Sequence, residues 1–498
     1  MEDRFNLVDE PWIPVADAGR VSLRQVFTNP AYRALGGNPV QKIALMKLLL
    51  AIAQAACTPK DEAEWRSLGA EGLAQKCMEY LEQQHARFFL YGGNPFLQMP
   101  AISKAALQTY GAVLPEVSTG NTTVLSQVQI ERGLSDADKA LLLVVLMGFA
   151  LGGKKTDNSV VLTPNYQGKS NDKGKPATGK PGPAVAHMGL LHNFLMGENL
   201  WHSLWLNLMT EQQITRSNRY PEGCGTAPWE SMPKGEACSV AQRLKQSLMG
   251  RLVPLSRFCL LAENGLHYSQ GLSHPGYKEG VTDPSTAIDY SGKEPKALWV
   301  NSEKRPWRDL TALLSIFQEQ KSQGFQCLQV SSGLARATLV CPVFAVWSGG
   351  LRVSSNAGEQ YASGSDDYVE SQVWLQSSML GEFWFAQLQT EMTALDDLAK
   401  MLYGCVMAWF KEQLVDGSKF AAQATHTFWQ LCERDFQTLV DQCDQGEAHK
   451  KQRYSLRLRF AGYVHQAYDS LCPRDTARQL DAWARCRPNL SKYLKQEN

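Results

Sequence analysis

Lysines and glycines gather in residues 152–183, in a pattern that suits contact with a nucleic acid. Six lysines stand against two aspartates in this stretch, and six glycines interrupt them. Lysines neutralise phosphates with release of counterions, and glycines let a backbone approach a duplex closely. The narrow minor groove, with its degenerate pattern of donors and acceptors, suits small residues and a few polar groups. A long solvated loop without a partner would have the same composition.

A second basic group lies near the carboxyl end of the chain. Residues 447–498 carry eleven Lys and Arg side chains against five Asp and Glu. Lys450, Arg453 and Arg457 are three and four residues apart, so they share one face of a helix. Such a face could hold a single strand or a duplex backbone. A solvated helix face is the alternative, and the interleaved aromatic residues are expected to be core.

A polar tip follows a predicted strand at residues 339–351, which we expect to stop at Gly349 and Gly350. The tip has the sequence SSNAGEQ, at residues 354–360. Short tips with amide side chains can enter a base step and hydrogen-bond to the freed base edges. An ordinary turn is the alternative.

Enzyme signatures are missing from the sequence. We find no HExxH, GxSxG, phosphate-binding loop, dinucleotide fingerprint or run of metal-binding carboxylates. Asp366 and Asp367 form an isolated acidic pair, and His267 and His274 are a weak metal candidate. The twelve cysteines are scattered singly, so neither a zinc site nor a disulfide framework is predicted. Catalysis stays open, because triads assemble from distant positions.

The elements that must position these groups fall into two regions. Residues 1–369 mix helical and strand patterns, including a core helix at 38–58 and a buried helix at 140–151. From residue 370 the pattern is helical almost throughout. Short breaks separate four expected helices, at residues 380–415, 420–444, 447–471 and 476–496. Long amphipathic helices joined by short loops favour an antiparallel four-helix bundle, with Pro488 kinking the last helix. The predicted fold class is α+β, a large mixed α/β domain followed by this bundle.

The length, net charge and apolar stretches of the chain limit its expected location and binding partners. With 498 residues, two or three domains are expected. The net charge of +1 means that any nucleic-acid contact comes from a local patch or is shared with other subunits. The amino terminus has no signal-peptide pattern, and the most apolar stretch, 140–151, is too short to span a bilayer. We therefore expect a cytoplasmic protein with free thiols and no membrane contact.

Several stretches together resemble the CasA family, the large subunit of the type I-E CRISPR Cascade complex. The opening FNLVDEPWIPV is similar to the start of that family. In the family's order there follow ALMKLLLAIAQAACTPKDEAEW, NPFLQ, PGPAVAHMGLLHNFLMGENLWHSLWLNLM, TAPWE, RLVPLSRFCLL and PWRDL. The likeness covers nearly the whole chain, and the bundle resembles the family's carboxy-terminal domain.

The resemblance implies a non-catalytic subunit of an antiviral ribonucleoprotein. The chain would join other Cascade subunits on a CRISPR RNA, near the 5′ handle of that RNA. It would read the protospacer-adjacent motif in double-stranded target DNA and start the strand separation that leads to an R-loop. It would then recruit a nuclease-helicase. Base pairing with the guide would supply most of the sequence specificity.

The resemblance also assigns roles to particular residues. It implies that a glycine-rich loop enters the minor groove, for which we choose Gln167, Gly168, Lys169, Ser170 and Lys173. Lys278 is the candidate for the family's lysine in the middle region. A glutamine-bearing hairpin serves as the wedge, here with the amides of Asn356 and Gln360.

The loop beside the RNA handle matches Thr123, Val124, Leu125, Ser126 and Gln127. Some members carry a cysteine-rich motif in the middle region. This chain lacks that motif, so the resemblance implies no metal, and we expect no cofactor.

Two other functions stay open from the sequence. One is an enzyme of unrecognised class with a helical oligomerisation domain. The other is a scaffold in a different assembly.

Overall fold

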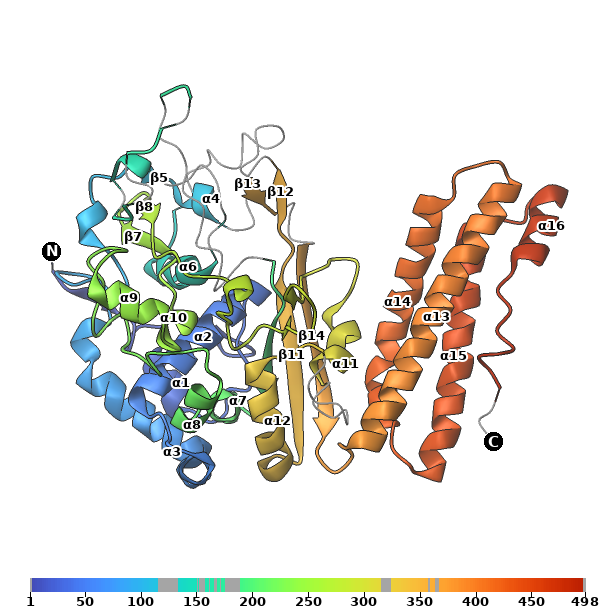
Figure 1. Ribbon diagram of the computed structural model, residues 1–498, viewed down its shortest axis with the longest axis horizontal. Coiled ribbons are helices and arrows are strands. Elements are labelled where there is room, and N and C mark those ends of the chain that lie inside the picture. Colours follow the sequence, from blue (N-terminus) through green and yellow to red (C-terminus); the bar gives the residue numbers. More distant parts are fainter. Residues whose placement is uncertain are drawn as a thin grey trace. The chain divides into compact units, whose positions relative to one another are not determined.

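A computed structural model describes most of the chain, and its residues divide into two compact units. The described residues are 2–114, 133–149, 151, 157–160, 162–164, 168–170, 172–174, 189–314, 324–356, 359–362 and 367–495. Unit 1 comprises Met1–Trp307 and Ser322–Gln372, and unit 2 comprises Arg308–Lys321 and Val373–Asn498. Unit 1 mixes helices and strands and unit 2 is helical (Figure 1), which confirms the predicted α+β class.

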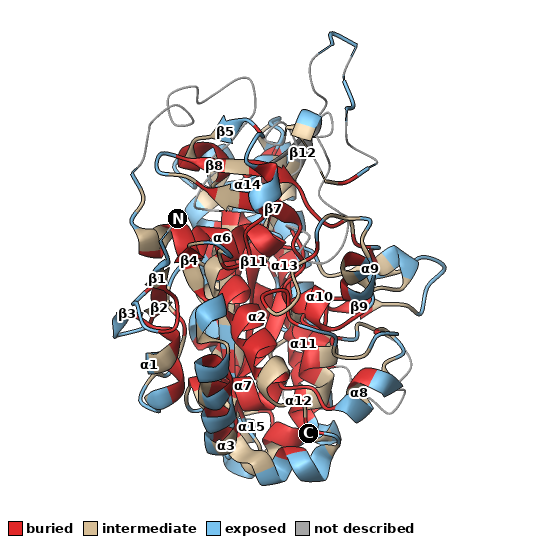
Figure 2. Cartoon of the chain, turned by 90° about the vertical axis from the view of Figure 1, so that its left-hand side faces the viewer, coloured by how far each residue is buried: buried red, intermediate tan, exposed pale blue. Residues whose placement is uncertain are grey.

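The centre of unit 1 is α2, Pro39–Ala56, which packs against α3, α6, α7 and β11. Asn38 caps its first turn and Pro39 occupies the first helical position, where a missing N–H costs nothing. Its buried residues surround the whole helix, as Figure 2 shows. In the described part of the chain, α2 is also the one helix long and apolar enough to cross a membrane, and 78% of that window is buried inside the protein.

The other helices of unit 1 cover this core. Ser135 caps α6, which forms the expected buried helix. The remaining helices and 3-10 turns have the bounds α1 Leu23–Thr28, α3 Glu62–Gln83, η1 His85–Arg87, η2 Pro100–Ile102, α4 Tyr110–Val113, α6 Asp136–Gly148, η3 Asn158–Val160, α7 Leu200–Asn207, α8 Glu211–Arg216, α9 Ser239–Lys245, α10 Met249–Leu252, η4 Tyr277–Glu279, η5 Pro306–Asp309 and α12 Leu328–Val340.

The sheets of unit 1 are small and antiparallel where their register is known. The strands are β1 Arg4–Asn6, β2 Ile13–Val15, β3 Gly19–Val21, β4 Phe89–Tyr91, β5 Leu107–Gln108, β6 His192–Met196, β7 Arg257–Leu261, β8 Leu266–Gln270, β9 Ile288–Asp289, β10 Lys296–Ala297, β11 Val343–Leu351, β12 Ser354–Asn356, β13 Glu359–Tyr361 and β14 Tyr368–Gln376. Two three-stranded sheets have the orders β14-β11-β6 and β5-β8-β7. The first sheet lies against α2 through β11.

The prediction for residues 339–351 is wrong about the start of the strand, because a helix, α12, runs to Val340 before β11 begins. The strand ends at Leu351, as predicted, directly after the two glycines. Gly350 is there because a side chain would meet Val300 and the carbonyl of Leu190, with the added Cβ only 3.0 Å from that oxygen. Close approach of a neighbouring backbone therefore selects glycine within a strand.

Unit 2 contains the predicted four helices, α13 Glu382–Glu412, α14 Ser418–Asp441, α15 Glu447–Leu471 and α16 Ala477–Cys486, with the short α11 Leu310–Leu313 beside α13. They lie side by side in Figure 1, and α13 contacts each of the other three. The last helix is shorter than predicted. It ends at Cys486, because Pro488 stops it instead of kinking it.

Candidate nucleic-acid interface

The lysine and glycine segment is tied to unit 1 near its middle. Thr163 is buried, and its hydroxyl donates to the carbonyl oxygens of Gln270 and Gly271 at the end of β8, at 3.3 and 3.0 Å. Five residues later, Gly168 has φ +71°, a left-handed conformation that favours glycine. The segment is therefore anchored to β8 at Thr163.

The predicted contact residues of this segment are exposed where they are described. Gly168, Lys169, Ser170 and Lys173 all lie at the surface. Gln167 lies outside the described residues.

The described chain continues at Gly189, after residues 175–188, and Gly189 lies directly against Trp299. The carbonyl of Gly189 accepts a hydrogen bond from the Val300 N–H at 2.6 Å, and Leu190 pairs with Trp299 as a β-bridge. Gly189 has φ +101°, and a Cβ there would lie 3.3 Å from Cε3 of the Trp299 ring. Both the backbone conformation and the indole therefore require glycine at this position.

Lys278 lies on a short exposed turn, η4, and the residue before it touches the same tryptophan. The turn is closed by the Glu279 carboxylate, which accepts from the Gly276 N–H at 2.6 Å. The rings of Tyr277 and Trp299 meet in a T-shaped arrangement with centroids 6.4 Å apart. The Lys278 Nζ is 3.8 Å from Glu294, and both side chains are more than half exposed. An ion pair this open is worth between zero and about 1 kcal/mol.

The amide-bearing tip is a two-stranded hairpin, and it starts beside Gly189. In the β12–β13 register, Asn356 is opposite Glu359 and Ser355 is opposite Gln360. Val353, directly before β12, would be 3.8 Å from a Cβ on Gly189. The preceding Arg352 donates from Nη1 to the Ser302 hydroxyl at 2.9 Å.

Residues from three segments that are far apart in the sequence thus lie close together. Gly189 and Tyr277 pack against Trp299, which is 47% exposed, and Val353 lies beside Gly189. Trp299 was not among the predicted site residues. Its aromatic type was the only local signal, because the convergence depends on long-range contacts.

The expected basic face of the bundle is not present, which corrects that prediction. Arg453 is buried, and its Nη1 donates to the carbonyl oxygens of Gln442 and Asp444, where α14 ends. Arg457 makes a two-point ion pair with Glu391 of α13, at 2.7 and 3.1 Å. Only Lys450 of the three is exposed, paired to Glu447 at 2.7 Å. The part of this helix face that carries Arg453 and Arg457 points into the bundle, because these arginines bond to acceptors there.

The loop predicted to lie near the RNA handle, Val124, Leu125, Ser126 and Gln127, falls outside the described residues. The residues that flank the undescribed stretch, Leu114 and Leu134, line a hollow of about 220 Å³. Asn38, Gln41 and Asp138 supply polar groups to the wall of that hollow.

Asp283, Ser285 and His192 form a buried polar grouping with the residue types of a catalytic triad. The Ser285 hydroxyl lies 2.7 Å from Asp283 and 2.8 Å from Nδ1 of His192. The serine bridges the other two groups, whereas in a triad the histidine does. All three residues are at least 96% buried, so no substrate reaches them. We therefore assign this grouping to the core.

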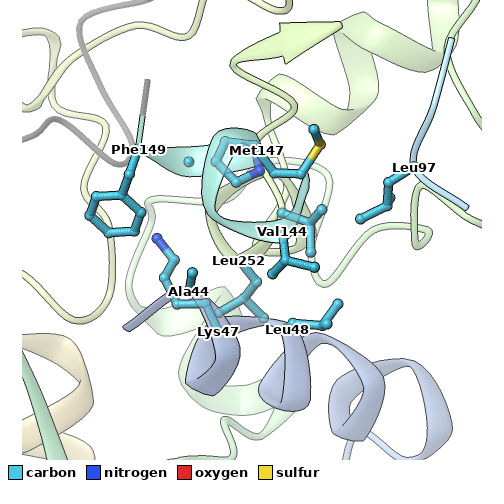
Figure 3. A pocket seen from close by; sticks show the side chains of 11 residues that line it. Ala44, Lys47, Leu48, Leu97, Val144, Met147, Phe149 and Leu252 are labelled. Carbon is cyan, nitrogen blue, oxygen red and sulfur yellow. The ribbon is translucent and has the colours of Figure 1, made fainter. Parts of the chain in front are cut away.

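Lys47 completes the buried network through an ion pair with Asp283. Burial opposes the charge on Asp283, but the adjacent Lys47 ammonium holds the pKa of that carboxyl below its usual value. Burial lowers the pKa of His192 to about 4, so its imidazole is neutral at pH 7. Figure 3 shows Lys47 among apolar side chains of α2, α6 and α10, around a cavity of about 10 Å³. A cavity of this size holds at most one water.

The weak metal candidate is accounted for by other contacts. His267 bonds the Ala105 carbonyl at 2.8 Å, and both ring nitrogens of His274 have partners, Arg251 and the Pro254 carbonyl. Within the described residues, no group of three or more His, Cys, Asp or Glu side chains could hold a metal ion.

Comparison with known proteins gives one family. Residues 6–467 match the family described as CRISPR-associated protein Cse1. The CRISPR-associated protein CasA/Cse1 of Thermus thermophilus is 29% identical over 339 residues, which are 63% of this chain and 60% of that protein. The chain thus aligns with less than two thirds of the length of this relative.

Solved structures have the same fold over nearly the whole chain. Thermobifida fusca Cse1 matches with a TM-score of 0.78 at 20% identity, covering 99% of each chain. A chain of a CRISPR RNA-guided surveillance complex matches with a TM-score of 0.66 at 14% identity, covering 98% of this chain and 99% of that one.

Proposed function

The chain belongs to the CRISPR-associated Cse1 (CasA) family, and from this membership we propose that it is the large subunit of a type I-E Cascade complex. In this role it assembles with a CRISPR RNA and the other Cascade subunits in the cytoplasm. The likeness of its fold to a chain of a CRISPR RNA-guided surveillance complex supports the assembly.

Within that complex, the chain reads the protospacer-adjacent motif in duplex DNA and helps to open the target. The close approach of these segments around Gly189 and Trp299 carries this proposal. An exposed lysine-bearing loop, a lysine on a short turn and a projecting hairpin are the parts needed to hold phosphates, probe a groove and separate a base step. All three belong to unit 1, and the Lys278 turn and the base of the hairpin adjoin Gly189 and Trp299.

We propose that the mixed α/β region, predicted at residues 1–369, is the DNA-recognition domain, and that the region predicted at 370–498 is the helical bundle. Of the first range, Arg308–Lys321 groups with the bundle in unit 2. Because Arg453 and Arg457 are used inside the bundle, phosphate contact on that face is limited to Lys450. We propose that the chain is non-catalytic, and we assign the buried Asp283, Ser285 and His192 grouping to the core. Cleavage is left to a nuclease-helicase that the complex recruits, as family membership implies.

The proposal is tested by reconstitution with a guide RNA. Complexes assembled with and without this chain are compared for the Kd of a fully paired target duplex that carries or lacks the flanking motif. We expect discrimination between the two duplexes to require the chain. Equal discrimination by the complex without the chain would overturn the proposal.

A further inference from the structure

Trp299 is exposed in a way that its neighbours do not explain. Val300 is buried and Leu298 is half-buried, while the Trp299 side chain is 47% exposed. In the part of unit 1 that the structure describes, every other tryptophan is buried or half-buried. A large, half-exposed aromatic side chain that packs against Gly189 and Tyr277 indicates a binding surface.

The indole is held in place from two sides. Tyr277 meets it in the T-shaped arrangement, and Gly189 lies against the ring carbons Cε3 and Cζ3. The hydrogen bond from Val300 to Gly189 fixes the backbone next to the ring. A ring already fixed in this way loses little conformational freedom when a flat ligand binds to it.

Two exposed cations belong to segments that adjoin this tryptophan. Lys278 follows Tyr277 directly, and its contact with Glu294 is long and solvent-exposed. Arg352 is exposed and bonds to Ser302, three residues after the tryptophan. An aromatic face with two cations in adjoining segments matches a nucleotide, whose base stacks while its flanking phosphates meet the positive charges.

We propose that Trp299 is a stacking platform for an unpaired nucleobase that is released at the base of hairpin β12–β13 when the target duplex opens. The inference rests on the proposed function and names a further binding residue for it. Stacking needs no particular base, because every base has a π-face. Trp299 therefore stabilises the opened state without adding to the recognition of the motif.

The test uses the assembled guide-RNA complex and target duplexes that carry 2-aminopurine at single positions next to the motif. Stacking on an indole quenches the fluorescence of 2-aminopurine. With the natural chain we therefore expect the fluorescence at one position to fall when the duplex opens, and with Trp299→Ala we expect it to stay high. Trp299→Ala should also weaken the opened complex about tenfold. Trp299→Phe keeps a π-face and should restore quenching and stability in large part.

Two controls separate stacking from loss of folding. Trp299→Leu keeps apolar bulk against Tyr277 and Gly189 but has no π-face, so it should behave as the alanine variant while melting at the natural temperature. Trp374→Ala removes another exposed tryptophan, in unit 2, and should leave quenching unchanged.

Normal quenching in the Trp299→Ala complex, with motif-dependent binding intact, would overturn the stacking role and leave the proposed function standing. A Trp299→Ala chain that no longer enters the complex would also overturn it, because the ring would then contact a protein subunit. Failure of the natural complex to bind the motif-bearing duplex would instead overturn the proposed function, and the stacking role with it.

Discussion

The ammonium of Lys278 lies 3.8 Å from the carboxylate of Glu294, and both groups are open to solvent. A lysine in such a pair can exchange the carboxylate for a phosphate, because a phosphate competes well with an exposed carboxylate. If Lys278 contacts DNA as proposed, Glu294 is its competitor.

Replacing Lys278 and replacing Glu294 should change the affinity for duplex DNA in opposite directions. Lys278→Ala should weaken binding of the complex to a motif-bearing duplex and reduce its salt slope by about one. Glu294→Gln should strengthen binding, since the competing charge is gone. Titrations at salt concentrations from about 50 to about 200 mM measure the affinity and the salt slope of both variants, because phosphate contacts weaken over this range. Weakening by Glu294→Gln would show that the carboxylate positions the lysine instead.

The exposed lysines of the 152–183 segment should contribute non-specific affinity. Lys169→Ala with Lys173→Ala should weaken duplex binding and lower the salt slope by about two, because each contact releases counterions. Lys76→Ala, an exposed lysine of α3, is the matched control and should change neither quantity. An unchanged slope in the double variant would rule out phosphate contact by these two lysines.

The hairpin should act on opening more than on first contact. Replacing Asn356 and Gln360 by Ala should slow strand separation while leaving initial duplex binding nearly intact, because the amides act only on freed base edges. Stopped-flow fluorescence of a labelled duplex separates the two steps. A target with a preformed bubble should restore the rate, and equal loss in both steps would contradict a wedge.

The bundle arginines should matter for stability and not for DNA. Glu391 is 1% exposed, so Arg457→Ala leaves a buried carboxylate unpaired and should cost about 3–5 kcal/mol in free energy of unfolding. Lys450→Ala removes an exposed pair and should cost less than about 0.5 kcal/mol. Denaturant titration followed by circular dichroism measures both. Replacing Arg457 and Glu391 together with Leu should recover much of the loss, because no charge is then buried alone.

Stability should fall as the pH is lowered from 6.5 toward 4. Burial holds the pKa of His192 at about 4 in the folded chain, against 6.5 when unfolded. The unfolded chain therefore takes up a proton in this window and the folded chain does not, which favours unfolding by up to about 3 kcal/mol. Burial also lowers the pKa of His274, which acts in the same direction.

His192→Asn should reduce this pH dependence, and His426→Asn, at an exposed position, should not. Thermal melting at pH 5 and pH 7.5 gives the comparison. An identical drop in the natural and His192→Asn chains would assign the effect to other groups.

The sequence by itself determined the elements whose pattern is local. Helical periodicity and capping residues predict α2, α6 and the helices of the bundle, because a helix repeats every 3.6 residues whatever it packs against. The stretches that resemble the CasA family, in their order along the chain, were enough to identify the family.

Only the tertiary structure decided whether each helix face is buried or exposed, and which residues it contacts. Periodicity puts Arg453 and Arg457 on one face, but Glu391 and the end of α14 decide that this face is buried. At Gly350, the close approach of Leu190 and Val300 selects glycine within the strand, and the sequence around it does not show this. Trp299 acquires its place from Gly189 and Tyr277, which are distant in sequence. Contacts of this kind are set by packing between remote segments, and no local spacing encodes them.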